Sequence, residues 1–180
     1  MAPAGAWRRS WQHALRLGGA AAFEYHAGVV TSSDTERVSH ERVFKQATLD
    51  DLASIREYVR GAAASGGLAG VDLEELIVAV NEATSNIIRH GFRGRPANIK
   101  VVVACDPEAV EVILRDEGPA FDPDSAPRPD TSLSLAERPF GGMGVQLMRE
   151  LCDELHYRRE PAGGNELRLM KKLSQDDRAS

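Results

Sequence analysis

The chain has 180 residues, of which 42% are hydrophobic and 27% charged, and its formal net charge is -5. This length and composition predict one globular domain with a core of its own. The acidic balance, without a dense cluster of lysine and arginine, argues against nucleic-acid binding, and the apolar runs are too short to span a membrane. The two cysteines, Cys105 and Cys152, lack the spacing of a disulfide framework or a metal site, so we interpret them as reduced thiols of a cytoplasmic protein.

The first 40 residues differ in composition from the rest and are predicted to be an N-terminal extension. They are rich in alanine and glycine and then polar, with Trp7, Trp11 and Leu15 spaced for one face of a short helix. A docked helix and a disordered extension are both compatible with this pattern. A histidine and an arginine interrupt the apolar residues, so no signal peptide is predicted.

The compact domain is predicted over residues 42–173, followed by a tail at 174–180. Its first elements are a strand at Val43–Ala47 and a helix at Leu49–Ala64. The helix has apolar residues at helical spacing and is followed by a Ser-Gly-Gly stop signal.

A long amphipathic helix is predicted over Asp72–Gly94. Its apolar stripe comprises Leu73, Leu76, Ile77, Val80, Thr84, Ile87 and Ile88. Glu82, Asn86 and His90 follow one another at four-residue spacing on the opposite side, so a carboxylate and an amide lie about 6 Å apart on one face. Asp72 is interpreted as the start of the helix, with Glu75 three residues later as in a capping box.

The second half of the chain alternates strands, a loop and a helix. Two Val- and Ile-rich strands form a predicted hairpin, residues 116–142 form a long loop with five prolines, and further strands follow a short helix. The predicted elements are strands at Ile99–Ala104 and Val110–Arg115, a helix at Gly144–Leu151, and strands at Glu154–Arg159 and Glu166–Leu173.

Three short motifs in this half are candidates for ligand binding. In RDEGPAF, Asp116 at the end of a strand can accept a hydrogen bond from an exocyclic amine, and Gly118 allows a flat ring to approach the backbone. In GGMGVQLM, residues 141–148, glycines open a helix whose free N–H groups suit phosphate oxygens. GGNEL, residues 163–167, leads into the last strand. Each motif alone is also typical of an ordinary turn or helix entry.

The order of these motifs resembles the Bergerat-type ATPase domain of the GHKL superfamily. The order is E-x-x-x-N on a helix, two strands, D-x-G, a proline-rich loop, G-x-G opening a helix, and G-G-N-E-L. Within that superfamily the chain resembles the anti-sigma-factor serine kinases of bacterial partner switching, over residues 42–173. The resemblance implies an α+β fold, a two-layer sandwich with helices on one face of a mixed, mainly antiparallel sheet.

The resemblance also implies ATP and Mg²⁺ as cofactors. Glu82 would be the general base toward a serine hydroxyl, and Asn86 would ligate Mg²⁺. Residues 122–142 would be the ATP lid, with Arg138 near the terminal phosphate. The implied nucleotide-binding residues are Asn86, Asp116, Gly118, Ala120, Arg138, Gly142, Met143, Gly144 and Asn165.

Three positions bear on these assignments. Pro139 and Phe140 make the lid differ from the family's R-S-G-M-G form, which affects the assignment of Arg138. Asn165 stands where many relatives have threonine. His90 occupies a position that is often histidine, and we interpret it as orienting the end of the helix.

The implied partners are a sigma factor and a STAS-type anti-sigma-factor antagonist, which the kinase would phosphorylate on serine or threonine, with a homodimer as the expected assembly. An alternative is an ATP-binding regulator that sequesters a partner without phosphorylating it. A sensor histidine kinase shares the ATP fold, and Ser39-His40-Glu41-Arg42 resembles its phosphoacceptor box. That box should lie on a dimerising helix far upstream, whereas only 46 residues separate His40 from Asn86.

Overall fold

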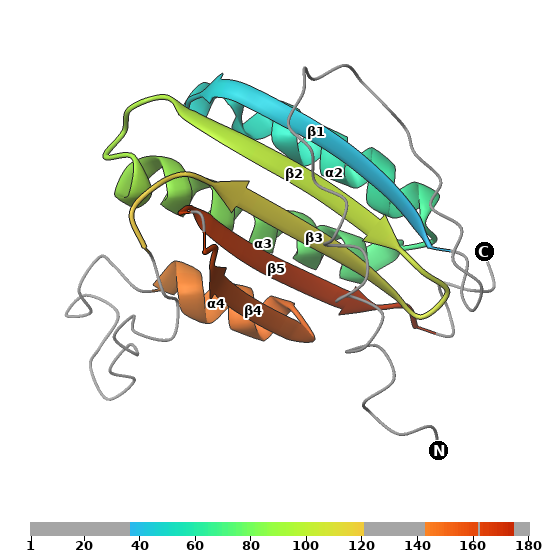
Figure 1. Cartoon of the computed structure of the whole chain (residues 1–180). Helices are drawn as coiled ribbons and strands as arrows, with labels where there is room; N and C mark the ends of the chain where they lie inside the picture. Colours follow the sequence, from blue (N-terminus) through green and yellow to red (C-terminus); the bar gives the residue numbers. More distant parts are fainter. Residues whose placement is uncertain (1–36, 121–142, 162, 175–180) are drawn as a thin grey trace, which may run out of the picture.

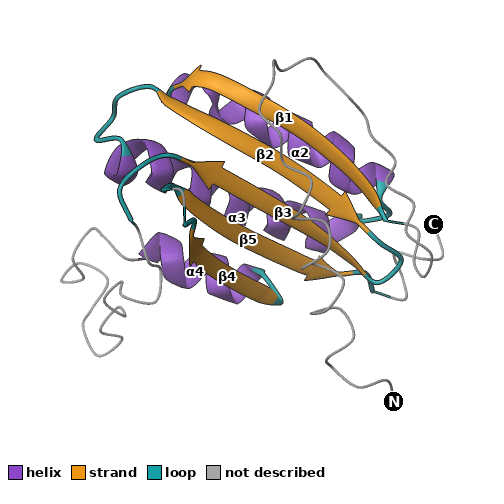
Figure 2. Cartoon of the chain, in the orientation of Figure 1, coloured by secondary structure: helices purple, strands orange, loops and turns teal. Residues whose placement is uncertain are grey.

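The computed structural model describes residues 37–120, 143–161 and 163–174, which form two layers (Figure 1). One layer is a five-stranded sheet in the order β1-β2-β3-β5-β4, and each neighbouring pair is antiparallel. The helices cover one face of this sheet (Figure 2). The strands are β1 (Val38–Ala47), β2 (Ala97–Cys105), β3 (Ala109–Asp116), β4 (Glu154–Arg159) and β5 (Asn165–Lys172).

The predicted α+β sandwich is confirmed, with one correction to the sheet. The sheet was expected to be mixed, but the pairs among the described strands are all antiparallel. Strands β3 and β4 run in the same direction, but β5 lies between them and runs opposite to both, so no parallel pair arises.

In the described ranges the helical layer consists of three α-helices, one 3-10 turn and one short π-helix. No helix in the described ranges is long and apolar enough to cross a membrane. The elements are η1 (Leu49–Asp51, a 3-10 turn), α2 (Leu52–Ser65), α3 (Gly70–Asn86), η2 (Ile87–Gly91, a π-helix) and α4 (Met143–Leu151).

The core lies between the two layers, where the stripe of α3 faces alternate residues of the central strands. In β2, Ile99, Val101 and Val103 are completely buried, as the two-residue period of a strand requires. On α3, Leu76 and Val80 are equally buried, which confirms the predicted helical stripe. The opposite side of α3 is therefore left to carry polar groups.

Several element boundaries differ from the predictions, with the largest differences at β1 and α3. Strand β1 begins at Val38, because its register with β2 continues to Val38 opposite Cys105. Helix α3 begins at Gly70 and ends at Asn86, where the π-helix replaces it before the predicted end at Gly94. The carboxylates of Asp72 and Glu75 do not cap it but bind the ammonium group of Lys171 at 2.9 and 2.7 Å.

The predicted helix at Leu49–Ala64 divides into η1 and α2. A capping interaction explains its start, since the Asp51 carboxylate accepts hydrogen bonds from the Thr48 backbone N–H at 2.8 Å and the Thr48 hydroxyl at 3.1 Å. The N-terminal extension up to residue 36, the lid segment 121–142 and the end of the tail at 175–180 lie outside the described residues.

Candidate functional site

The carboxylate of Glu82 and the amide of Asn86 meet the beginning of helix α4 at Gly144. A side chain at Gly144 would place its Cβ 2.8 Å from Oε2 of Glu82 and 3.3 Å from Nδ2 of Asn86. These distances are shorter than ordinary van der Waals contact, so the beginning of α4 lies directly against both side chains. The E-x-x-x-N pair and the G-x-G motif, about 60 residues apart in sequence, therefore form one site.

Glu82 and Asn86 are both half-buried, although the stripe of α3 faces away from them. The cause is α4, which packs along α3 and covers this side of it. In the described part of the chain, neither side chain has a hydrogen-bond partner for its polar end. The first amide groups of the nine-residue α4 lie beside them, with the positive end of the helix dipole. The arrangement offers oxygen ligands for a hard cation and N–H donors for an anion.

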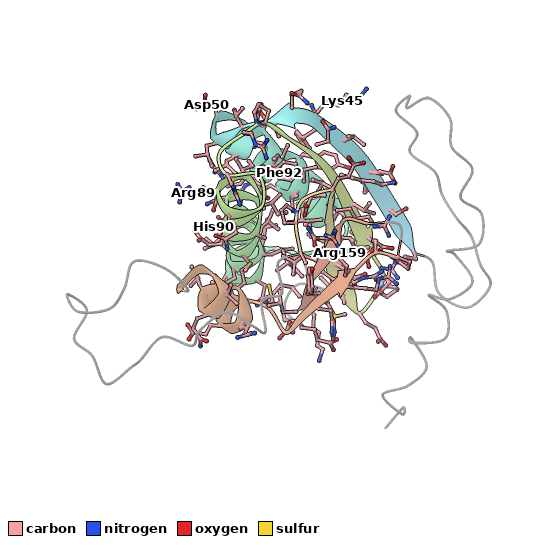
Figure 3. The ribbon with its side chains drawn as sticks, turned by 60° about the vertical axis from the view of Figure 1, so that its left-hand side comes forward. Lys45, Asp50, Arg89, His90, Phe92 and Arg159 are labelled. Atoms are coloured by element: carbon pink, nitrogen blue, oxygen red, sulfur yellow. The ribbon has the colours of Figure 1, made fainter. Side chains whose placement is uncertain are left out.

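The π-helix η2 follows directly after Asn86 and ends the regular α-helical spacing. It ends at Gly91 and is stabilised at its end by the N–H of Phe92, which donates to the carbonyl of Ile87. His90 is exposed, so the line of Glu82 and Asn86 does not continue to it. In Figure 3, Arg89 and His90 point away from the sheet, while Phe92 lies between the helices and the sheet.

Asp116 and Gly118 form a second part of the site at the end of β3. Oδ1 of Asp116 accepts the backbone N–H of Gly118 at 2.7 Å. A Cβ at Gly118 would lie 2.8 Å from that oxygen and 3.0 Å from the Phe92 ring. Gly164, at a φ of +102°, passes so close that a Cβ there would lie 2.6 Å from the Asp116 carbonyl oxygen. Glycine is thus required on both sides of the Asp116 turn.

Asn165, the first residue of β5, connects this turn to the edge strand β4. Its Nδ2 donates to Oδ1 of Asp116 at 2.9 Å and to the carbonyls of Gly118 and Pro119 at 3.3 and 3.0 Å. Its Oδ1 accepts the Tyr157 hydroxyl at 2.8 Å and Nη1 of Arg159 at 2.9 Å. Nη1 of Arg159 also donates to the Gly118 carbonyl at 2.8 Å.

Burial is the strongest influence on the charge of Asp116. Asp116 is only 8% exposed, and its burial away from water raises the pKa of its carboxyl group above the usual range. The hydrogen bonds from Asn165 and Gly118 and the charge of Arg159 oppose the shift, and Glu117 adds to it. The network around Asn165 therefore favours the charged, acceptor-only form of Asp116.

The two cysteines take no part in this site. Both are free and buried, in agreement with the prediction of reduced thiols. Burial raises the pKa of Cys105 to about 11 and that of Cys152 to about 12, so both thiols stay protonated and poorly nucleophilic at neutral pH.

The described ranges contain no group of three or more His, Cys, Asp or Glu side chains that could hold a metal ion by themselves. A site that supplies one amide oxygen suits Mg²⁺, which keeps several waters and takes further oxygens from a bound phosphate. Asn86, whose side chain lies beside Gly144 at the beginning of α4, fits that description.

The residues predicted for the site fall into two groups. Glu82, Asn86 and Gly144 come together between α3 and α4, and Asp116, Gly118 and Asn165 come together at the end of the sheet. Met143 is the first residue of α4, and Ala120 is exposed in the chain after the Asp116 turn. Arg138 and Gly142 lie outside the described residues.

Sequence reasoning missed three residues that border the site, namely Phe92, Tyr157 and Arg159. Figure 3 shows Arg159 on the sheet side, across from the helix that carries His90. Tyr157 and Arg159 are two residues apart on β4, and so lie on the same face of the strand. The two-residue spacing in the sequence could predict that Tyr157 and Arg159 share a face of β4, but it does not indicate that this face contacts Asn165.

Comparison with known proteins gives a family match over most of the chain. The model of the family described as "Histidine kinase-like ATPase domain" matches residues 45–171. The "Serine-protein kinase RsbW" of a Bacillus cereus strain is 29% identical over 108 residues, which are 58% of this chain and 68% of that protein. The "Serine/threonine-protein kinase BtrW" of Bordetella bronchiseptica is 36% identical over 95 residues, covering 52% and 66% respectively.

Proposed function

Since the chain belongs to the histidine kinase-like ATPase domain family, we propose that it binds Mg²⁺-ATP and transfers the terminal phosphate to a serine or threonine of a partner protein. The observation that carries this proposal is the close approach of Gly144 to Glu82 and Asn86, where both side chains meet the first amides of α4. A base, an oxygen ligand and an anion-binding helix end are thereby gathered at one point. Phosphoryl transfer depends mainly on such positioning and on electrostatic stabilisation.

The nucleotide base is assigned to the turn at the end of β3. Asp116 accepts hydrogen bonds and donates none when it is ionised, so it suits the exocyclic amine of adenine. Its Oδ1 is already bound by Gly118 and Asn165, and Oδ2 has no partner among the described residues. Gly118 and Phe92 border this position and leave no room for a further side chain there. Ala120 continues the same turn.

The phosphates are assigned to the beginning of α4. The amides that follow Met143 and Gly144 would bind phosphate oxygens, with Asn86 as the protein ligand of Mg²⁺. Asn86 would hold Mg²⁺, which would supply positive charge against the charge that develops during transfer. Arg138 and Gly142 are assigned to the same phosphates from the family resemblance alone.

Glu82 is assigned as the general base. Its carboxylate lies at the gap between α3 and α4, is half-buried, and has no hydrogen-bond partner among the described residues. It is therefore available to accept the proton of an incoming serine hydroxyl as that oxygen attacks phosphorus. Binding of ATP alone does not require a base at this position.

The biological role proposed is partner switching in transcription, in the cytoplasm. Two of the similar proteins are named as serine or serine/threonine protein kinases. By the family resemblance, the chain would bind a sigma factor as a homodimer and phosphorylate a STAS-type antagonist.

The test uses proteins that co-purify with the full chain from its native lysate. The complex is incubated with Mg²⁺-ATP, and the intact mass of each partner is recorded for wild type, Glu82→Gln and Glu74→Gln. Glu74 is an exposed carboxylate on the same helix that pairs with Arg60, and so serves as the matched control.

We expect one added phosphoryl group on a partner with wild type and Glu74→Gln. With Glu82→Gln, the transfer rate should fall by about 10² or more while ATP binding is retained. ATP binding without any mass gain would instead establish sequestration without phosphorylation. No ATP binding by the wild type would overturn the proposal entirely.

A further inference from the structure

The side-chain amide of Asn165 has no hydrogen-bonding capacity left for a ligand. Its two N–H hydrogens face three acceptors, and its oxygen, with two lone pairs, accepts from two donors. The residue is also buried, at 6% exposure. Asn165 therefore acts within the protein, as a connection between β4 and the Asp116 turn.

Tyr157 and Arg159 determine which way this amide points. The guanidinium of Arg159 can only donate, so the end of Asn165 that faces it must be the oxygen. The Tyr157 hydroxyl occupies the second lone pair of that oxygen at 2.8 Å. With the oxygen held there, the NH₂ group must face Oδ1 of Asp116. Reversing the amide would set N–H groups against Arg159 and leave the Asp116 oxygen without this donor.

The orientation of Asn165 fixes the Asp116 carboxylate in turn. Oδ1 of Asp116 is held by two donors, Asn165 and the N–H of Gly118, so the carboxylate cannot rotate without losing both. Arg159 holds the same turn a second time through the carbonyl of Gly118. The remaining oxygen, Oδ2, is then presented in one direction as a pure acceptor.

We propose that Tyr157 and Arg159 are positioning residues for base selectivity, which act through Asn165 to present Asp116 as an acceptor for adenine and against guanine. An acceptor-only group binds the amine of adenine and repels the carbonyl oxygen that guanine carries at the same ring position. This inference rests on the proposed function, because it requires that the Asp116 turn receives the base.

The charge of Arg159 adds a dependence on pH. Burial raises the pKa of Asp116. The hydrogen bonds from Asn165 and Gly118 and the charge of Arg159 lower this pKa, and the charge of Glu117 raises it. Removing the Arg159 cation therefore raises the pKa of Asp116 further. Protonation then converts the acceptor into a donor at a higher pH than in the wild type, and adenine binding is lost over that range.

The experiment measures binding of Mg²⁺-ATP and Mg²⁺-GTP to the full chain by titration calorimetry between pH 5 and pH 8. The variants are Arg159→Gln, Arg159→Lys and Tyr157→Phe. Arg158→Gln is the matched control, because Arg158 is the neighbouring residue on β4, is exposed, and pairs with Glu160 at 2.7 Å and with Glu166 at 3.2 Å. Glu166 keeps Arg115 and Arg168 as partners in this variant. Thermal unfolding of each variant establishes that it is folded.

We expect Arg159→Gln to weaken ATP binding by about tenfold or more, to change GTP binding little, and to move the pH midpoint of ATP binding upward. Arg159→Lys, which keeps a cation, should restore the midpoint, and Arg158→Gln should match the wild type. Tyr157→Phe removes one oxygen only, so it stays folded and should lose part of the selectivity.

Two results would overturn the inference in different ways. If the wild type prefers ATP and folded Arg159→Gln and Tyr157→Phe keep the same selectivity and pH midpoint, the positioning role is wrong while ATP binding stands. If the wild type binds neither nucleotide, the proposed function fails and takes the inference with it.

Discussion

Substitution of Gly144 by alanine separates the geometry of the site from the stability of the fold. The added Cβ would lie 2.8 Å from Oε2 of Glu82, whereas ordinary van der Waals contact begins at 3.4 Å, so that oxygen must retreat by 0.6 Å. The oxygen is the far end of a flexible side chain, so it can give way by a change of rotamer. The backbone of α4 need not move.

The expected cost in stability is small. Alanine in place of glycine favours a helix by up to about 1 kcal/mol, and an off-rotamer Glu82 costs about 0.5–1.5 kcal/mol. The two contributions largely cancel, so the melting temperature should change by no more than about 4 °C. The rate of phosphoryl transfer should nevertheless fall by about tenfold to a hundredfold, because displacing a general base or a phosphate-binding group by close to 1 Å lowers a rate by about that factor.

Thermal unfolding and the rate of mass gain on the partner protein measure the two effects. Gly61→Ala is the control, because Gly61 lies inside α2 and a Cβ there would meet nothing within 4 Å. It should stabilise the chain by about 1 kcal/mol without changing transfer. Unchanged transfer in Gly144→Ala would refute the reasoning, since it would mean that neither Glu82 nor the start of α4 takes part in the reaction.

Two further predictions concern ion pairs. Lys171→Met removes the cation that binds Asp72 and Glu75, and urea unfolding at pH 7 should show a loss of about 1–2 kcal/mol. Burial lowers the pKa of Lys171, but its carboxylate partners raise that pKa overall. The stabilisation by Lys171 is therefore complete below the pKa of lysine in the unfolded chain and disappears as the pH rises through the pKa of Lys171 in the folded protein. An equal difference in stability between Lys171→Met and wild type in strong alkali would contradict this. Burial raises the pKa of Glu166, but the hydrogen bonds from Arg168 and Arg115 lower that pKa overall. The stabilisation by Glu166 is therefore present above the pKa of glutamate in the unfolded chain and is lost as the pH falls through the pKa of Glu166 in the folded protein. Glu166→Gln should therefore unfold more easily at pH 7 and match the wild type in acid, and a gap that persists in acid would exclude this linkage.

Local pattern was sufficient to predict most of the fold. Segments rich in Val and Ile indicated β2 and β3, and β4 has the predicted bounds, Glu154–Arg159. The apolar stripe of α3 is buried as expected. These features depend on residues two to four positions apart, which a single sequence displays directly.

The errors and omissions come from contacts between distant residues. Asp72 was interpreted as a helix cap, but its partner Lys171 lies 99 residues away on β5. His90 was expected to continue the line of Glu82, but the π-helix changes the spacing after Asn86. The hydrogen bonds around Asn165 join three separate segments, so no local spacing could reveal them.

Strand β5 contacts a different half of the site at each of its ends, and its Lys171 end joins the sheet to the helical layer. At one end Asn165 holds the Asp116 turn, and at the other Lys171 binds the first turn of α3, the helix that carries Glu82. The two halves of the site lie on different layers. Their separation therefore depends on the ion pairs of Lys171 with Asp72 and Glu75, which lie away from both halves. Loss of the Lys171 ion pairs would let α3 tilt and the proposed nucleotide site widen without a substitution at any residue assigned to the nucleotide, and faster amide exchange along the first turn of α3 would report it.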